Sequence, residues 1–88
     1  MSVGNNVANY KISATGTASD IDSNFEEVGE IKMLTNGADV HIKIGNGDAT
    51  TDDFMLQANI EITFPVNAHR VSAITGGSSS TLYIAFIY

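Results

Sequence analysis

The chain has 88 residues, and its four basic and ten acidic side chains give a formal net charge of −6. An acidic chain is not attracted to phosphates or anionic lipids, which argues against nucleic-acid and membrane partners. It has no Cys, which excludes disulfides, zinc–thiolate sites and thiolate catalysis. Because so short a chain buries little surface, we expect partner subunits to add stability.

Composition favours a soluble, all-β protein. The first ten residues lack the basic start and apolar core of a signal peptide, and no apolar run is long enough to span a membrane as a helix. Hydrophobic residues make up 43% of the chain, charged residues only 16%, and there are eight Gly. This balance is typical of a globular β-domain rather than of a disordered or helical chain.

The first elements are an arm, a strand and a loop. Residues 1–7 are assigned to a flexible N-terminal arm and residues 8–88 to a single domain. Residues 8–14 alternate, with Tyr10 and Ile12 on one face, as in a short edge strand.

Residues 15–24 are polar except for Ile21 and predict a loop. Ser23 and Glu26 fit a capping box, which leaves open a single helical turn through Phe25.

The middle of the chain predicts two strands joined as a hairpin. Residues 28–35 form the first, with a bulge near Gly29. Asn36-Gly37 is a strong signal for a hairpin turn, because both turn positions must accept a positive φ. Residues 38–44 form the second strand by strict alternation, with Val40, Ile42 and Ile44 facing inward.

The C-terminal half predicts further short strands. They are residues 54–56, 60–64, 71–75 and 81–88, separated by a polar surface loop at 45–53, a turn at 57–59, a connection after Pro65 and a hairpin loop at 76–80. We therefore predict a small antiparallel β-sandwich or jelly-roll-like barrel of six to eight strands. Its predicted core is Ile31, Met33, Val40, Ile42, Ile44, Leu56, Ile62, Phe64, Val71, Ile74, Leu82, Ile84 and Phe86.

The last strand is apolar on both faces and carries no charge. Leu82, Ile84 and Phe86 line one face, while Tyr83, Ala85 and Ile87 line the other. An apolar outer face must be covered by a loop, an arm or another subunit. We favour a subunit, and predict a partner interface formed by Tyr10, Ile12, Tyr83, Ala85 and Ile87.

No set of residues predicts catalysis. His41 and His69 are expected on the surface, and no Ser or Thr lies in a nucleophile-elbow context. Residues 20–24 start like a calcium loop, but Phe25 stands where that loop needs Gly. Whether the acidic loop Asn46 to Asp53 holds an ion stays open. We expect no catalytic residues, no metal, no cofactor and no enzymatic activity.

Several segments carry a resemblance, among them Ile42-Lys43-Ile44-Gly45, Phe54-Met55-Leu56-Gln57-Ala58 and Arg70-Val71-Ser72-Ala73-Ile74. Together with the loop GDATTDD they resemble the small β-rich virion proteins of tailed bacteriophages. Pro65-Val66-Asn67-Ala68-His69 departs from the proline–glycine turn usual in that group.

The resemblance implies a structural role in a bacteriophage virion. It would make the chain a capsid decoration or cement protein, made in the host cytoplasm and located on the capsid surface, where it stabilises the assembled shell. Its partners would be the major capsid protein or other virion subunits, and its own copies as a homo-oligomer, with a trimer favoured; neither nucleic acid nor membrane is expected. The alternatives are a tail or fibre-associated adaptor and a glycan-binding module displayed on the particle.

Overall fold

The structure is a computed structural model that describes residues 6–88, and these residues form eight β-strands. The strands are β1 (Val7–Ala14), β2 (Ser19–Asp22), β3 (Glu30–Asn36), β4 (Val40–Ile44), β5 (Phe54–Leu56), β6 (Glu61–Phe64), β7 (Arg70–Ile74) and β8 (Ser80–Ile87). Within the described range no helix is long and apolar enough to cross a membrane. Five residues of the arm predicted at 1–7 lie outside the described residues, and β1 begins at Val7.

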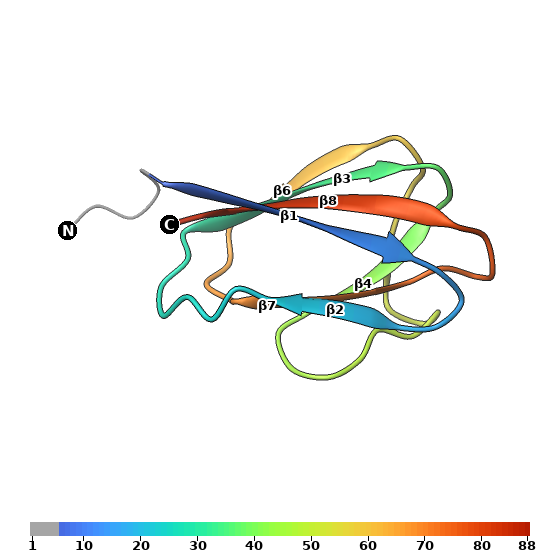
Figure 1. Cartoon of the computed structure of the whole chain (residues 1–88), viewed down its shortest axis with the longest axis horizontal. Coiled ribbons are helices and arrows are strands. Elements are labelled where there is room, and N and C mark those ends of the chain that lie inside the picture. Colours follow the sequence, from blue (N-terminus) through green and yellow to red (C-terminus); the bar gives the residue numbers. More distant parts are fainter. Residues whose placement is uncertain (1–5) are drawn as a thin grey trace.

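The strands form two four-stranded antiparallel sheets packed face to face. Sheet A has the order β1-β8-β3-β6 and sheet B the order β2-β7-β4-β5. In Figure 1, sheet A is the upper layer and sheet B the lower one. Only the β4–β5 connection stays within one sheet, whereas every other connection between consecutive strands crosses between the sheets. This strand order is that of a jelly roll, so the predicted all-β fold class is confirmed.

The core lies between the two sheets and is almost entirely apolar. Nine of the thirteen predicted core residues are buried, and Ile44, Ile62 and Phe64 are partly buried against them. Ile74 is the exception, because Val71 and Ala73 face inward on β7 and the strand alternation turns Ile74 outward. The buried cluster is Ile12, Ala14, Val28, Ile31, Met33, Val40, Ile42, Leu56, Val71, Ala73, Leu82, Ile84 and Phe86.

The predicted hairpin at Asn36-Gly37 is wrong, because β3 belongs to sheet A and β4 to sheet B. The predicted hairpin loop at 76–80 is wrong for the same reason, since it joins β7 of sheet B to β8 of sheet A. The two connections pack on each other, with Ser80 Oγ donating to the carbonyl of Ala38 at 2.9 Å. Gly37 has a φ of +127°, and a Cβ there would lie 3.2 Å from the Ser79 carbonyl oxygen. Close approach of two crossing connections therefore explains this glycine.

Residues 15–24 are not only a loop, since they contain β2, which pairs with β7. The signal was weak because Asp20 and Asp22 are exposed and Ile21 is the strand's one apolar residue. The helical turn left open near Phe25 does not form. Instead the Phe25 ring stacks on Tyr88, with centroids 4.1 Å apart.

The strand predicted at 28–35 begins two residues later, at Glu30. Val28 lies before the strand, and its N–H donates to the Asn67 side chain at 2.8 Å. Its side chain is buried from this loop position, so no bulge is needed to explain why it is out of phase.

Candidate functional site

The outer face of sheet A is the candidate site, because it is hollowed and carries exposed apolar side chains at its centre. Leu34 on β3 and Tyr83 on β8 are directly paired and are 40% and 42% exposed. Next to Tyr83 on the same face, Ala85 leaves a hollow of about 260 Å³. The hollow is lined by Asn9, Tyr10, Lys32, Leu34, Glu61, Tyr83, Ile84 and Ala85.

Charged and polar side chains surround this apolar centre. Lys11 pairs with Tyr83 from the edge strand β1, and Glu61 pairs with Leu34 from the opposite edge strand β6. Lys32 lies beside Ala85 in the neighbouring row. An apolar centre with a polar rim is the arrangement found in protein–protein interfaces.

Of the five residues of the predicted interface, three lie on the outer face of sheet A and two face the interior. Tyr83, Ala85 and Ile87 lie on the outer face of β8, because Leu82, Ile84 and Phe86 are buried on the other side. Ile12 is 3% exposed and belongs to the core.

Tyr10 also faces inward, and its ring packs edge-to-face on Phe86 at 5.6 Å. Ile12 and Tyr10 therefore pack on the inner side of sheet A, whereas Tyr83, Ala85 and Ile87 lie on its outer face.

The sequence reasoning missed Leu34, Val7 and the charged ends of the face. Leu34 follows from the alternation of β3, since Ile31 and Met33 are buried and the residues between and after them face outward. Val7, the first residue of β1, is 57% exposed and is paired with Ile87. The signal that could have found Lys11 and Glu61 is strand register, which a single sequence does not provide.

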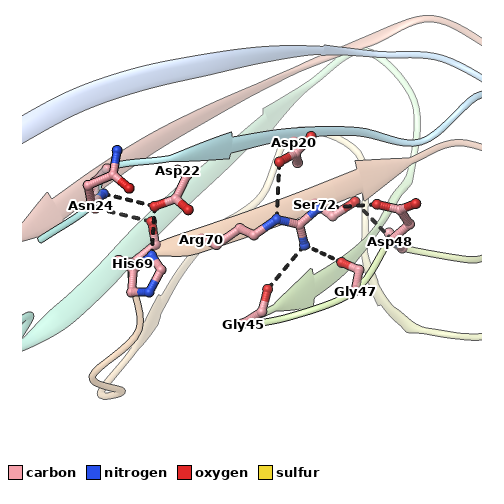
Figure 2. A network of polar contacts seen from close by, with 11 residues as sticks. Asp20, Asp22, Asn24, Gly45, Gly47, Asp48, His69, Arg70 and Ser72 are labelled. Atoms are coloured by element: carbon pink, nitrogen blue, oxygen red, sulfur yellow. Dashed lines mark hydrogen bonds and ion pairs between the residues drawn. The ribbon is translucent and has the colours of Figure 1, made fainter. Parts of the chain in front are cut away.

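The outer face of sheet B is partly covered by the chain itself, although Met55 on β5 stays 42% exposed there. Residues 45–53, the β4–β5 loop, fold back over this face, beneath the lower sheet in Figure 1. Arg70 on β7 fastens the loop, because its Nη1 donates to the carbonyl oxygens of Gly45, at 3.2 Å, and Gly47. Its Nη2 donates to Asp48 at 3.1 Å, and its Nε donates to Asp20 of β2 at 3.1 Å (Figure 2). The guanidinium group therefore joins β2, β7 and the loop.

Two further contacts hold the same loop. Ser72 Oγ accepts from the N–H of Ala49 at 2.9 Å, and both residues are buried. The His41 Nδ1 atom lies 3.0 Å from the Asp53 carbonyl oxygen. His41 was predicted on the surface. In the structure it is half-buried and contacts the end of this loop.

The acidic loop does not gather its oxygens around one point. Asp48 pairs with Arg70, and the Asp53 carboxylate accepts from the N–H of Thr50 at 2.7 Å. Among residues 6–88, no three His, Cys, Asp or Glu side chains come together in a way that could hold a metal ion.

His69 and Asp22 form a second polar contact beside Arg70. Nδ1 of His69 lies 2.6 Å from the Asp22 carboxylate, and the N–H of Asn24 donates to the same carboxylate at 2.8 Å (Figure 2). The backbone hydrogen bond from Asn24, followed by the one from His69, lowers the pKa of Asp22. Both side chains are exposed, so this contact ties the end of β2 to the start of β7 without forming a pocket.

Sequence comparison assigns no family to this chain. No protein-family model matches it, and no curated protein matches it.

Structure comparison finds cupin domains and transcriptional regulators. The cupin domain of an XRE-family transcriptional regulator from Enterobacter cloacae is 14% identical, with a TM-score of 0.61 over 93% of this chain and 81% of that chain. A cupin superfamily protein from Desulfitobacterium hafniense is 15% identical, with a TM-score of 0.51 over 100% and 84%. An HTH_3-family transcriptional regulator from Vibrio cholerae is 11% identical, with a TM-score of 0.59 over 93% of this chain, which spans only 43% of that regulator.

These comparisons show that the fold is similar to that of cupin domains, and at such identities they show the fold alone. They overturn the resemblance to phage virion proteins, the function as a capsid decoration protein and the location on a capsid surface, because the similar structures are cupin domains and regulators. The resemblance was misleading because alternating strands and polar loops describe a jelly roll, which viral capsid proteins and cupins share.

Proposed function

We propose that this chain is a non-catalytic assembly domain that binds a second copy of itself through the outer face of sheet A. The observation that carries the proposal is the exposure of Leu34 and Tyr83 side by side at the centre of a four-stranded face. Apolar side chains gathered in this way, with polar ones at the rim, are typical of a surface that another protein covers.

The non-catalytic part of the proposal is supported by how the polar side chains of sheet B are used. Every nitrogen of the Arg70 guanidinium group donates within the chain, and Ser72 Oγ accepts from a backbone N–H. His41 and His69 contact a backbone carbonyl and a carboxylate of the same domain. Within residues 6–88, these polar groups are used to hold the domain together, which supports a non-catalytic role.

A matched pair of substitutions tests the proposal. Tyr83→Asp places a charge on the sheet A face, and Met55→Asp places the same charge on sheet B at a residue that is also 42% exposed. Sedimentation velocity over a range of micromolar concentrations should find dimers for the wild type and for Met55→Asp, and monomers for Tyr83→Asp. A wild type that stays monomeric at every concentration overturns the proposal, and so does a dimer that persists in Tyr83→Asp.

A further inference from the structure

One row of four residues crosses the whole outer face of sheet A. Strand pairing places Lys11 of β1 opposite Tyr83 of β8, Tyr83 opposite Leu34 of β3, and Leu34 opposite Glu61 of β6. All four side chains are exposed. From one edge of the sheet to the other, the row therefore reads cation, aromatic ring, aliphatic side chain, anion.

Among residues 6–88, the charged ends of this row form no ion pair. The ion pairs within residues 6–88 join Arg70 to Asp20 and to Asp48, and His69 to Asp22. Lys11 and Glu61 lie on the two edge strands of sheet A, about 14 Å apart at the usual strand spacing. They are too distant to pair with each other, so both charges are available to another molecule.

We infer that two copies pack sheet A against sheet A around a two-fold axis parallel to the strands, so that Lys11 of each copy meets Glu61 of the other. This inference rests on the proposed self-association and specifies its geometry. Rotation about such an axis reverses the strand order, which brings β1 opposite the second copy's β6 and β8 opposite its β3. The same rotation places Tyr83 of each copy on Leu34 of the other.

Charge selects this axis over the other two-fold axis that lies in the plane of the interface. An axis perpendicular to the strands, through the same row, would bring β1 opposite β1 and β6 opposite β6. Lys11 would then face Lys11, and Glu61 would face Glu61. Like charges in contact across an interface are unfavourable, whereas the strand-parallel axis gives two opposite-charge pairs.

The size of the face indicates a weak dimer. Four strands, the longest of eight residues, cover about 19 by 26 Å, or about 500 Å² for each copy. The total of about 1,000 Å² lies near the lower limit for a specific interface, so we expect dissociation in the micromolar range. Because the interface is the same patch on both copies, it closes at two, which gives a dimer instead of the trimer favoured from the sequence.

Charge reversal tests the geometry. K11E alone and E61K alone each place like charges opposite one another at both contacts of a homodimer, and each should weaken the dimer about tenfold or more at low salt. The double variant K11E/E61K restores opposite charges and should recover wild-type affinity. The difference should shrink in 1 M NaCl, where exposed charges are screened.

Mixing the two single variants gives the most specific test. In a mixed dimer, two acidic side chains of the K11E copy face two basic side chains of the E61K copy. Native mass spectrometry of the mixture should therefore find mainly heterodimers, although each variant alone is mostly monomeric. K43E, which places the same charge change on sheet B, is the matched control for K11E and should dimerise like the wild type.

The outcomes separate this inference from the proposed function. If Tyr83→Asp abolishes the dimer while K11E and E61K do not weaken it, the face is right and the two-fold geometry is overturned. A trimer, or a double variant that is weaker than either single one, also overturns the geometry. If the wild type is a monomer at every concentration, the proposed function itself fails.

Discussion

The outer faces of the two sheets differ in how much of their surface the chain itself covers. On sheet B the chain covers part of the face itself, with a nine-residue loop that Arg70 and Ser72 fasten to β7. On sheet A no segment of the described chain replaces that cover, and Leu34 and Tyr83 lie exposed at the centre. Polar contacts within the chain can therefore cover much of one outer face, while exposed apolar side chains leave the other available for association.

The largest expected effect concerns the fastening of the loop. Arg70→Met removes the contacts to Asp20, Asp48 and two loop carbonyls, and should lower the free energy of unfolding by about 2 kcal/mol. Urea denaturation measures it, and faster hydrogen exchange at the Ala49 amide would place the damage in the loop. Lys43→Met, on the same face but outside these hydrogen bonds, is the control. Equal stability of the two variants would mean that the loop needs no fastening.

A smaller loss is expected at the second contact. Ser72→Ala leaves the buried N–H of Ala49 without its acceptor, which should cost about 1 to 2 kcal/mol in the free energy of unfolding. Ser79→Ala, in an exposed loop position, should change stability by less than about 0.5 kcal/mol. A neutral Ser72→Ala would show that the loop covers sheet B without depending on this hydrogen bond.

On sheet A, polar substitutions should leave the fold almost unchanged. Leu34→Asn should alter the unfolding free energy of the monomer by less than about 0.5 kcal/mol, because the side chain faces water in a single copy. Denaturation at concentrations below the dimer range measures this. A loss as large as that of Arg70→Met would mean that this face contributes to the folding core of a single chain.

The smallest effect is a pH dependence at Asp22. Its pKa is lowered in the folded protein, so the carboxylate stabilises the fold at pH values above the ordinary pKa of Asp. This contribution is lost as the pH falls through the lowered folded value. The stability difference between the wild type and Asp22→Asn should therefore be small at neutral pH and vanish in acid. A difference that grows as the pH falls would contradict this contact.

Local patterns predicted much of the fold. Alternation along β4 placed Val40 and Ile42 in the core, and the uncharged β8 predicted both a buried face and a face that another surface must cover. The strand β2 was missed because Ile21 is its one apolar residue, too few to show an alternation, and the strand depends on backbone pairing with β7 for its structure. The glycines near residues 37 and 76 correctly marked changes of direction, but not which sheet the chain enters next.

The sequence pattern was enough to predict the strands other than β2, most of the inward side chains and the outward position of Tyr83, Ala85 and Ile87. These follow from a period of two residues, which is a local property of an extended chain. Other relations depend on how the strands pack together. They are the hold of Arg70 on the loop, the inward position of Tyr10 and Ile12, and the row in which Lys11 and Glu61 flank Tyr83 and Leu34. Those relations join strands that are far apart in the chain, and their register is set by the packing of the whole sandwich, which no local pattern contains.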